Sequence, residues 1–342
     1  MDYIPLVRSI GLLPFLPFLK DIGSPMEKWL NKARIPCRAL EDPDALISLH
    51  SATVFLDQAA RSEGLATLGL LVGQRTAIDQ LGTFGMLVRR SPTLFEGINT
   101  AQRLSVAMNS GIRIWIERDE NQVWIFHRNL SPLSLGRQQV DLYGLALILN
   151  LIRLAAGPFW KPAEIRLQMP RSSALTDSET FFGVRILFDE PASAVALPTE
   201  LLSRPLIAVE SPLVATCAGA EWLRRSAPAL DFAGSLEQLL RSQLREGSPG
   251  IHRVAEMSGM SARSLQRRLL DEGTEYGRLV QRVRFNLAMS LLNDPSIKLK
   301  NIACELGYHD PANFTRAFRR WTGTCPQEVR KHRRATGPIR ES

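Results

Sequence analysis

The sequence predicts two domains that differ in fold class: an α+β domain over residues 1–205 and an all-helical domain over residues 231–342, joined by a linker over residues 206–230. The length of 342 residues suits two domains, since single domains hold about 100–200 residues. Before residue 205, apolar side chains recur at both helix and strand spacing, whereas after residue 231 they recur at helix spacing alone. With 45% hydrophobic and 22% charged residues, the composition is that of a globular protein.

The excess positive charge of the chain lies entirely in its C-terminal part. Residues 245–342 hold 18 Lys and Arg against 10 Asp and Glu, whereas residues 1–244 hold 24 of each. Such an asymmetry is typical of a module that binds nucleic acid or an anionic membrane, attached to a neutral domain. A solvated basic surface without a partner is the alternative.

Neither a metal site nor a membrane anchor is expected. The cysteines are far apart and form no metal-binding or disulfide pattern, which fits a reducing cytoplasm; they are Cys37, Cys217, Cys304 and Cys325. The apolar N-terminus is interrupted by Arg8 and by three prolines, and it lacks the basic start and cleavage site of a signal peptide. We therefore expect this segment to pack on the first domain, and we expect no metal, no cofactor and no membrane partner.

The α+β domain is expected to combine four helices with a small antiparallel sheet. Ser24 is the expected N-cap of the first helix, with Pro25 at its first position. The predicted helices cover residues 25–36, 44–62, 91–108 and 138–155. Alternating side chains predict a β-hairpin over residues 111–128, and further strands at 164–169 and 192–198.

Two segments of the basic region repeat one pattern, residues 251–273 and residues 299–323. Val254-Ala255 matches Ile302-Ala303 and Gly259 matches Gly307 at an offset of 48; after the turn the offset becomes 49, and Arg267 then matches Arg316. Each segment has the form of a helix, a turn with glycine and a second helix, which is the helix-turn-helix unit. The units are expected at residues 251–272 and 299–321.

The second helix of each unit is expected to bury one face and to expose another. Leu265 and Leu269 share the buried face of the first copy, and Ser261 and Asp310 are the expected N-caps of the two copies. A helix fits the major groove of DNA, where Arg can pair with guanine, Gln with adenine, and the methyls of Ala and Thr can contact thymine. The candidate base-reading residues are Arg263, Gln266 and Arg267 in the first copy and Ala312, Thr315 and Arg316 in the second.

Three further arginines are candidates for contacts with DNA phosphates, which position a protein without reading sequence. They are Arg268, Arg319 and Arg320. Residues 275–294, between the two units, predict one helix that spans about 30 Å, close to the ~34 Å between major-groove segments on one side of the duplex. One chain could therefore read two groove segments.

The C-terminal motif resembles the AraC/XylS family of bacterial transcription regulators. The most specific stretch is IACELGYHDPANFTRAFRRWTGTCPQEVR, residues 302–330, in which Val329 stands where the family usually has an aromatic residue. Residues 1–205 are similar to the arabinose-binding-type N-terminal domain of one branch of the family, on GSPMEKWLNKARIP, GLLVGQ, SPTL and FFGVRILFDEPASAVALPTELLSRPL. The resemblance implies a sensor or dimerisation role for residues 1–205; the name of the domain is no evidence that arabinose binds.

These observations predict a DNA-binding transcription regulator that a small-molecule effector controls. The expected partner is double-stranded DNA at a promoter or operator; a homodimer, and RNA polymerase in the case of an activator, remain open. Candidate effector contacts are His50, Arg113 and His127, with structural histidines and an exposed strand arginine as the alternatives. An enzyme domain over residues 1–205 tethered to DNA is a second hypothesis, but no GK[ST], HExxH or GxSxG motif supports it.

Overall fold

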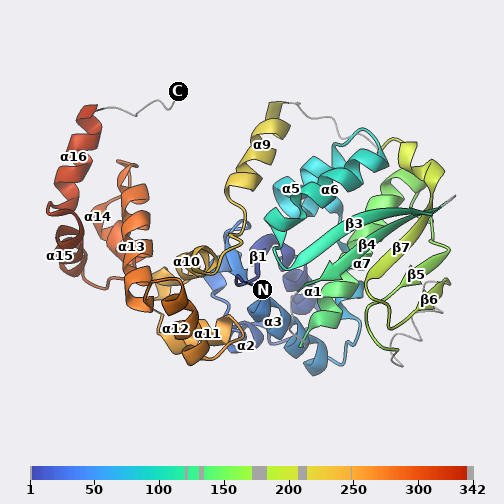
Figure 1. Ribbon diagram of the computed structural model, residues 1–342, viewed down its shortest axis with the longest axis horizontal. Helices are drawn as coiled ribbons and strands as arrows, with labels where there is room; N and C mark the ends of the chain where they lie inside the picture. Colours follow the sequence, from blue (N-terminus) through green and yellow to red (C-terminus); the bar gives the residue numbers. More distant parts are fainter. Residues whose placement is uncertain are drawn as a thin grey trace. The chain divides into compact units, whose positions relative to one another are not determined.

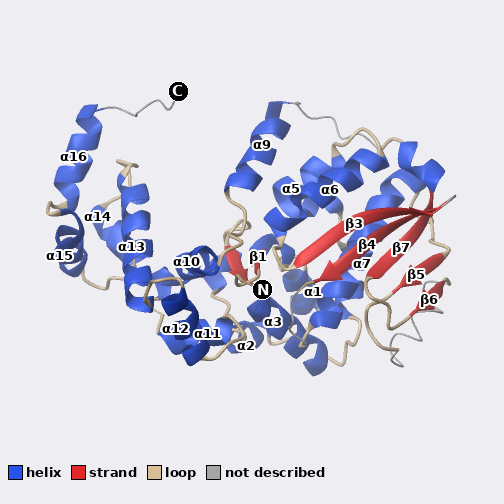
Figure 2. Cartoon of the chain, in the orientation of Figure 1, coloured by secondary structure: helices blue, strands red, loops and turns tan. Residues whose placement is uncertain are grey.

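A computed structural model describes residues 2–119, 122–130, 135–171, 183–206, 214–247 and 249–336 (Figure 1). The chain forms two compact units. The N-terminal unit is Pro5–Leu230, and the C-terminal unit combines Asp2–Ile4 with Asp231–Ser342. The strands all lie in the N-terminal unit, and the described part of Asp231–Ser342 contains helices without a strand (Figure 2).

The N-terminal unit contains a five-stranded sheet in the order β3-β4-β7-β5-β6. The strands are β3 (Ile112–Asp119), β4 (Gln122–Asn129), β5 (Glu164–Arg166), β6 (Arg185–Leu187) and β7 (Ser193–Pro198). The predicted hairpin is β3–β4, in which Ile114 lies opposite His127. The pairing is antiparallel as expected, except that β5 and β6 run parallel. A separate antiparallel pair joins β1 (Leu6–Arg8) to β2 (Leu46–Ser48).

Two helices of this unit, Leu94–Met108 and Arg137–Ala156, pack against the five-stranded sheet, and Leu49–Ser62 packs against the β1–β2 pair. The helices of the unit are α1 (Phe15–Asp21), α2 (Met26–Lys32), α3 (Leu49–Ser62), α4 (Leu68–Arg75), α5 (Gly82–Arg89), α6 (Leu94–Met108), α7 (Arg137–Ala156) and α9 (Val214–Arg225). Short 3-10 turns occur at Ser9–Gly11, Cys37–Leu40, Ile78–Leu81 and Thr199–Ser203, and in the C-terminal unit at Leu244–Glu246. The N-terminal segment packs on the unit as expected, because β1 and α1 are both part of the fold.

Helix α7 is the centre of the N-terminal unit. Among the described residues it is the helix long and apolar enough to cross a membrane, but half of the apolar stretch is buried inside the unit. It packs against α4 and α3 on one side and against β4 and β7 on the other. Its composition is therefore that of a central core helix, and it lies between two hydrophobic clusters, one on the sheet and one around α1 to α4.

Several element boundaries differ from the predictions. The first helix begins at Met26 with Pro25 as N-cap, because the Ser24 hydroxyl instead accepts a hydrogen bond from the Trp29 indole and donates one to Glu63. The predicted helix over residues 44–62 starts with strand β2, since Ser48 caps α3. Strand β6 was not expected; it is three residues long and is defined by its pairing with β5.

The C-terminal unit is built from α10 (Phe232–Gln243), α11 (Ile251–Met257), α12 (Ala262–Asp271), α13 (Tyr276–Leu292), α14 (Leu299–Glu305), α15 (Pro311–Thr322) and α16 (Pro326–Thr336). The pairs α11–α12 and α14–α15 are the two predicted helix-turn-helix units. Both predicted N-caps are confirmed: Ser261 accepts from the Ser264 amide and Asp310 from the Ala312 amide.

The segment expected as a linker, residues 206–230, contains helix α9. This helix packs against α5 and α6, and Leu223 is buried beside Leu104 and Ala107. The compact N-terminal unit consequently extends to Leu230.

Candidate nucleic-acid interface

The turn of each helix-turn-helix unit contains a left-handed glycine. Gly259 has φ 68° and Gly307 has φ 75°, a conformation that glycine adopts without the steric cost of a Cβ atom. At Gly307 there is a second reason, because a Cβ would lie 2.3 Å from the carbonyl oxygen of Leu244. Gly307 thus allows the second helix-turn-helix unit to pack closely against the end of α10.

Helix α12 sorts its side chains by face. Leu265 and Leu269 are fully buried, whereas Arg263, Gln266 and Arg267 are exposed. Within the described residues, neither Arg263 nor Arg267 forms an ion pair or hydrogen bond through its guanidinium. The structure therefore brings the three predicted readers of this helix together on one exposed face with free donor groups.

Helix α15 has the same arrangement with different chemistry. Phe314 and Phe318 are buried, Ala312 and Arg316 are exposed, and Thr315 is half-buried. The Thr315 hydroxyl donates to the Pro311 carbonyl at 3.0 Å, which leaves its methyl group as the free contact. Residue Asn313 accepts a hydrogen bond from the Arg316 guanidinium, so it holds that side chain along the helix.

The candidate phosphate contacts do not share one environment. Arg319 and Arg320 are exposed, and Arg319 donates to the Cys325 sulfur at 3.5 Å. Arg268 is half-buried instead, with its guanidinium carbon 5.3 Å from the ring centroid of Phe232 on α10. The equivalent position in the second repeat is the buried Ala317. Arg268 therefore projects away from the exposed face of α12.

Leu270 belongs to the exposed face of α12 and was missed in the sequence. It is 63% exposed and follows Gln266 and Arg267 by one helical turn. The signal was the spacing of three and four residues, which continues the face on which the readers lie. An exposed leucine at this position offers apolar contact to a thymine methyl or a sugar.

Not all of the positive charge in this unit is available to a partner. The guanidinium of Arg284 donates to the Leu306 carbonyl at 3.1 Å, and that of Arg330 donates to the Ile297 carbonyl at 2.8 Å. Arg282 and Arg245 form ion pairs with Glu237 and Glu305. These four arginines bond to other segments of the unit, whereas Arg263 and Arg267 on α12 and the three arginines of α15 are exposed.

Helix α13 connects the two recognition helices. Its 17 residues span about 26 Å at 1.5 Å per residue, somewhat less than expected. Its first half buries Leu279, Val280 and Val283. Its second half buries Ala288 and Leu292 in the core of the second helix-turn-helix unit. Because one rigid helix contributes to both cores, it fixes the spacing of α12 and α15.

The candidate effector contacts lie in different environments. His127 is 3% exposed and lines a cavity in the N-terminal unit. His50, on α3, and Arg113, on β3, do not line that cavity; the Arg113 guanidinium lies over the Trp115 ring instead. Of the three candidates, the structure therefore brings only His127 to this cavity.

Two family profiles match the chain. One describes the arabinose-binding domain of AraC transcription regulators and matches residues 23–206, more than half of the chain. The chain belongs to the AraC family of transcription regulators. The second profile, a helix-turn-helix domain, matches residues 254–332 and so covers both helix-turn-helix units of this AraC-family regulator.

Full-length relatives of this AraC-family chain are transcription regulators. The ornithine utilization regulator of Pseudomonas aeruginosa is 26% identical over 335 residues, 96% of this chain and 97% of that protein. The HTH-type transcriptional regulator VirS of Mycobacterium tuberculosis is 24% identical over 357 residues, 98% of this chain and 100% of that protein. The crystal structure of transcriptional regulator CdpR from Pseudomonas aeruginosa has a TM-score of 0.39 at 23% identity, over 90% of this chain and 96% of that one. The protein is a DNA-binding regulator and not an enzyme.

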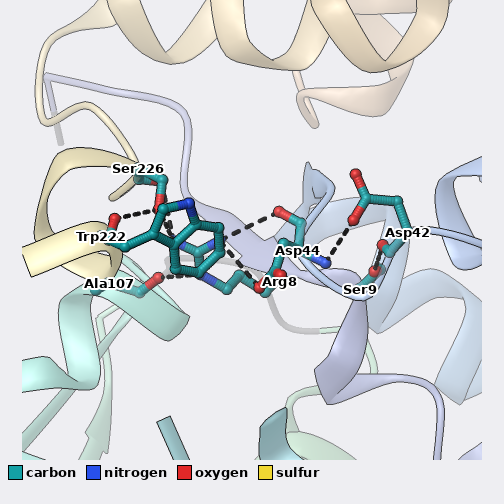
Figure 3. A network of polar contacts seen from close by, with 7 residues as sticks. All are labelled: Arg8, Ser9, Asp42, Asp44, Ala107, Trp222 and Ser226. Atoms are coloured by element: carbon teal, nitrogen blue, oxygen red, sulfur yellow. Dashed lines mark hydrogen bonds and ion pairs between the residues drawn. The ribbon is translucent and has the colours of Figure 1, made fainter. Parts of the chain in front are cut away.

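The AraC-family N-terminal unit also contains a buried arginine, Arg8, which interrupts the apolar N-terminal segment. Arg8 is 1% exposed. Figure 3 shows its guanidinium between the ends of three elements: it donates to the Ala107 carbonyl of α6 at 2.8 Å, to Ser226 after α9 at 2.8 and 3.0 Å, and to Asp44 before β2. The Trp222 ring lies 4.9 Å from it. Burial lowers the pKa of Arg8, while Asp44 opposes that shift.

Proposed function

We propose that one chain of this regulator reads two unlike half-sites in successive major-groove segments, with α12 in one and α15 in the other. The observation that carries the proposal is the pair of exposed, reader-bearing faces on two helices joined by one rigid spacer. Major-groove segments on one side of a duplex recur every ~34 Å, and a helix of about 26 Å with its flanking turns suits that repeat.

The two half-sites are expected to differ because the two faces differ. The face of α12 offers Arg263, Gln266 and Arg267, which suit guanine and adenine. The face of α15 offers the methyl groups of Ala312 and Thr315 beside one arginine, which suit thymine and guanine. A monomer's footprint should therefore be asymmetric rather than palindromic.

Genome-wide mapping of bound DNA, followed by affinity measurements on the recovered operator, tests this proposal. Arg267→Ala and Arg316→Ala should each weaken operator binding by about 1–3 kcal/mol, roughly 5- to 150-fold, and each should relax base preference in a different half-site. Arg103→Ala, which removes an exposed arginine of α6 in the N-terminal unit, is the charge-matched control and should leave base preference unchanged. If both reader variants relaxed the same base pair, or none, the assignment of the faces would be wrong.

We further propose that the N-terminal unit binds a small effector that changes affinity for DNA, and that the protein acts in the cytoplasm. The effector proposal is supported by the match of this unit to the arabinose-binding-type profile and by a cavity within the unit. Dimerisation through this unit, and contact with RNA polymerase in the case of activation, belong to the same proposal. Light scattering of the full chain and in vitro transcription from the mapped promoter test these two points.

A further inference from the structure

The N-terminal unit contains a partly open cavity of about 150 Å³ where its two hydrophobic clusters meet. The wall is formed by residues of β1, α1, α3, α5, α6 and α7 and by the β3–β4 hairpin, segments that span residues 7–151 of the chain. Protein cores are normally close-packed, with few voids larger than a water molecule. An apolar cavity of about 150 Å³ is large enough to hold a benzene-sized molecule.

The wall of the cavity is almost wholly apolar. Among the described residues that form it there is no Asp, Glu, Lys or Arg. Two of its polar side chains are already engaged: the Ser105 hydroxyl donates to the Gln102 carbonyl at 2.9 Å, and the Asn109 side-chain oxygen accepts from the Gly111 amide at 2.9 Å. Tyr143 packs its ring against Phe15, 4.9 Å between centroids. The wall thus has no counter-charge for an ion and too few free polar groups for a sugar.

Two polar groups of the wall, the His127 ring and the Tyr143 hydroxyl, are buried without a hydrogen-bond partner among the described residues, and His127 is the one whose nitrogens can both donate and accept. It comes from β4, and its ring lies against α7 at Gly144, where a Cβ would meet the ring nitrogen Nε2 at 2.7 Å. Within the part of the chain that the structure describes, its other ring nitrogen, Nδ1, has no hydrogen-bond partner. Burial lowers the pKa of His127 to about 4, so the imidazole is neutral at neutral pH. In a neutral imidazole one ring nitrogen donates a hydrogen bond and the other accepts one, so Nδ1 can take either role according to the tautomer.

We propose that this cavity binds an uncharged, mostly hydrocarbon effector with one hydrogen-bonding group, of the size of a single ring with a hydroxyl, and that His127 recognises that group. The inference rests on the proposed effector control and names the site and the chemical class. A charged amino acid would have to lose its hydration without a compensating partner, and a sugar would leave most of its hydroxyls unpaired.

The position of the cavity also indicates how a bound ligand would affect the C-terminal end of the N-terminal unit. Val7 and Met108 line it, and they are the chain neighbours of Arg8 and Ala107, which hydrogen-bond to each other. Arg8 in turn holds Ser226, four residues before the unit ends. A ligand that shifts β1 or the end of α6 would therefore shift the anchor of α9.

Calorimetric titration and thermal denaturation of the full chain with benzyl alcohol test the proposal, with benzoate and arabinose as probes that differ in charge and polarity. We expect saturable binding of benzyl alcohol, and binding of benzoate and of arabinose at least tenfold weaker. His127→Phe, which keeps a ring in place, should weaken the binding of benzyl alcohol at least tenfold and should not weaken the binding of benzene. Ala101→Leu fills the cavity from α6 and should abolish both, whereas Val106→Leu, on the exposed face of the same helix, should change neither.

The outcomes separate this inference from the proposed effector control. Equal binding of benzoate and benzyl alcohol, or binding that survives Ala101→Leu, would overturn the inference. If Ala101→Leu does not fold, unchanged binding in His127→Phe would overturn it equally. Saturable, His127-dependent binding with unchanged operator affinity would support the site and count against the control of DNA binding. An operator response to a charged metabolite that persists in Ala101→Leu would support control and refute this cavity as its site.

Discussion

Replacing Arg8 by methionine should loosen the end of helix α9 from the N-terminal unit. The substitution keeps an apolar stem and removes a guanidinium that is 1% exposed. The lost bonds join Arg8 to the Ala107 carbonyl at 2.8 Å and to Ser226 at 2.8 and 3.0 Å; those to Asp44 are longer, at 3.3 and 3.4 Å. The Trp222 ring would also lose the cation above it.

The magnitude follows from the burial of each partner. Ala107 is 5% exposed, so its carbonyl would be left without a partner at a cost of about 1–3 kcal/mol. Ser226 is half-buried and can bind water instead, so we assign it about 1 kcal/mol. The Asp44 side chain is 41% exposed, and its ion pair contributes no more than about 1 kcal/mol. Together these losses should lower the free energy of unfolding by about 2–5 kcal/mol.

Urea denaturation measures the global loss, and limited trypsin digestion measures the local one. Arg224 and Arg225 lie in the last turn of α9, so their cleavage should accelerate when that helix loses its anchor. Asp44→Asn is the matched control and should cost about 1 kcal/mol or less. If Arg8→Met cost no more than this control and cleavage at α9 did not change, the anchoring role of Arg8 would be refuted.

Three further outcomes are expected. Gly307→Ala should destabilise the C-terminal unit by at least about 1–2 kcal/mol, because Gly307 has a positive φ and lies close to the Leu244 carbonyl. Gly277→Ala, in open space on α13, is the control and should stabilise the unit by about 0.5–1 kcal/mol. Circular-dichroism melts that ranked the two variants in the opposite order would contradict this prediction. Burial raises the pKa of Asp141 from 3.8 to about 7, so between these pH values the folded state binds a proton that the unfolded state has lost. The free energy of unfolding therefore falls as pH rises from about 4 to about 7, by at most about 1.4 kcal/mol per pH unit. Asp141→Asn should flatten that fall in urea midpoints taken from about pH 4 to about pH 8, and an unchanged slope would exclude a buried, protonated Asp141. Arg320→Ala should weaken binding to all DNA sequences alike and reduce the slope of log affinity against log salt by about one, whereas a loss confined to the operator would argue against a phosphate contact.

The sequence alone determined the helix-turn-helix pair and the exposed faces of α12 and α15. The information there is local: caps at Ser261 and Asp310, a left-handed glycine in each turn, and a 3.6-residue period that sorts Leu265 from Arg267. Local signals of this kind need no knowledge of distant residues. Arg268 was expected at a DNA phosphate, but the structure places it half-buried over Phe232 of α10.

Only the tertiary structure decided the features that depend on distant pairing. Strands β2 and β6 are three residues long, and their pairing partners define them, not their side-chain pattern. The apolar N-terminus gave no reason to expect that Arg8 would bond to residues 99 and 218 positions away. The cavity likewise depends on segments between residues 7 and 151 meeting where two hydrophobic clusters fail to fill the space. A sequence specifies which side chains are apolar, but the space left between them is set by how whole elements pack.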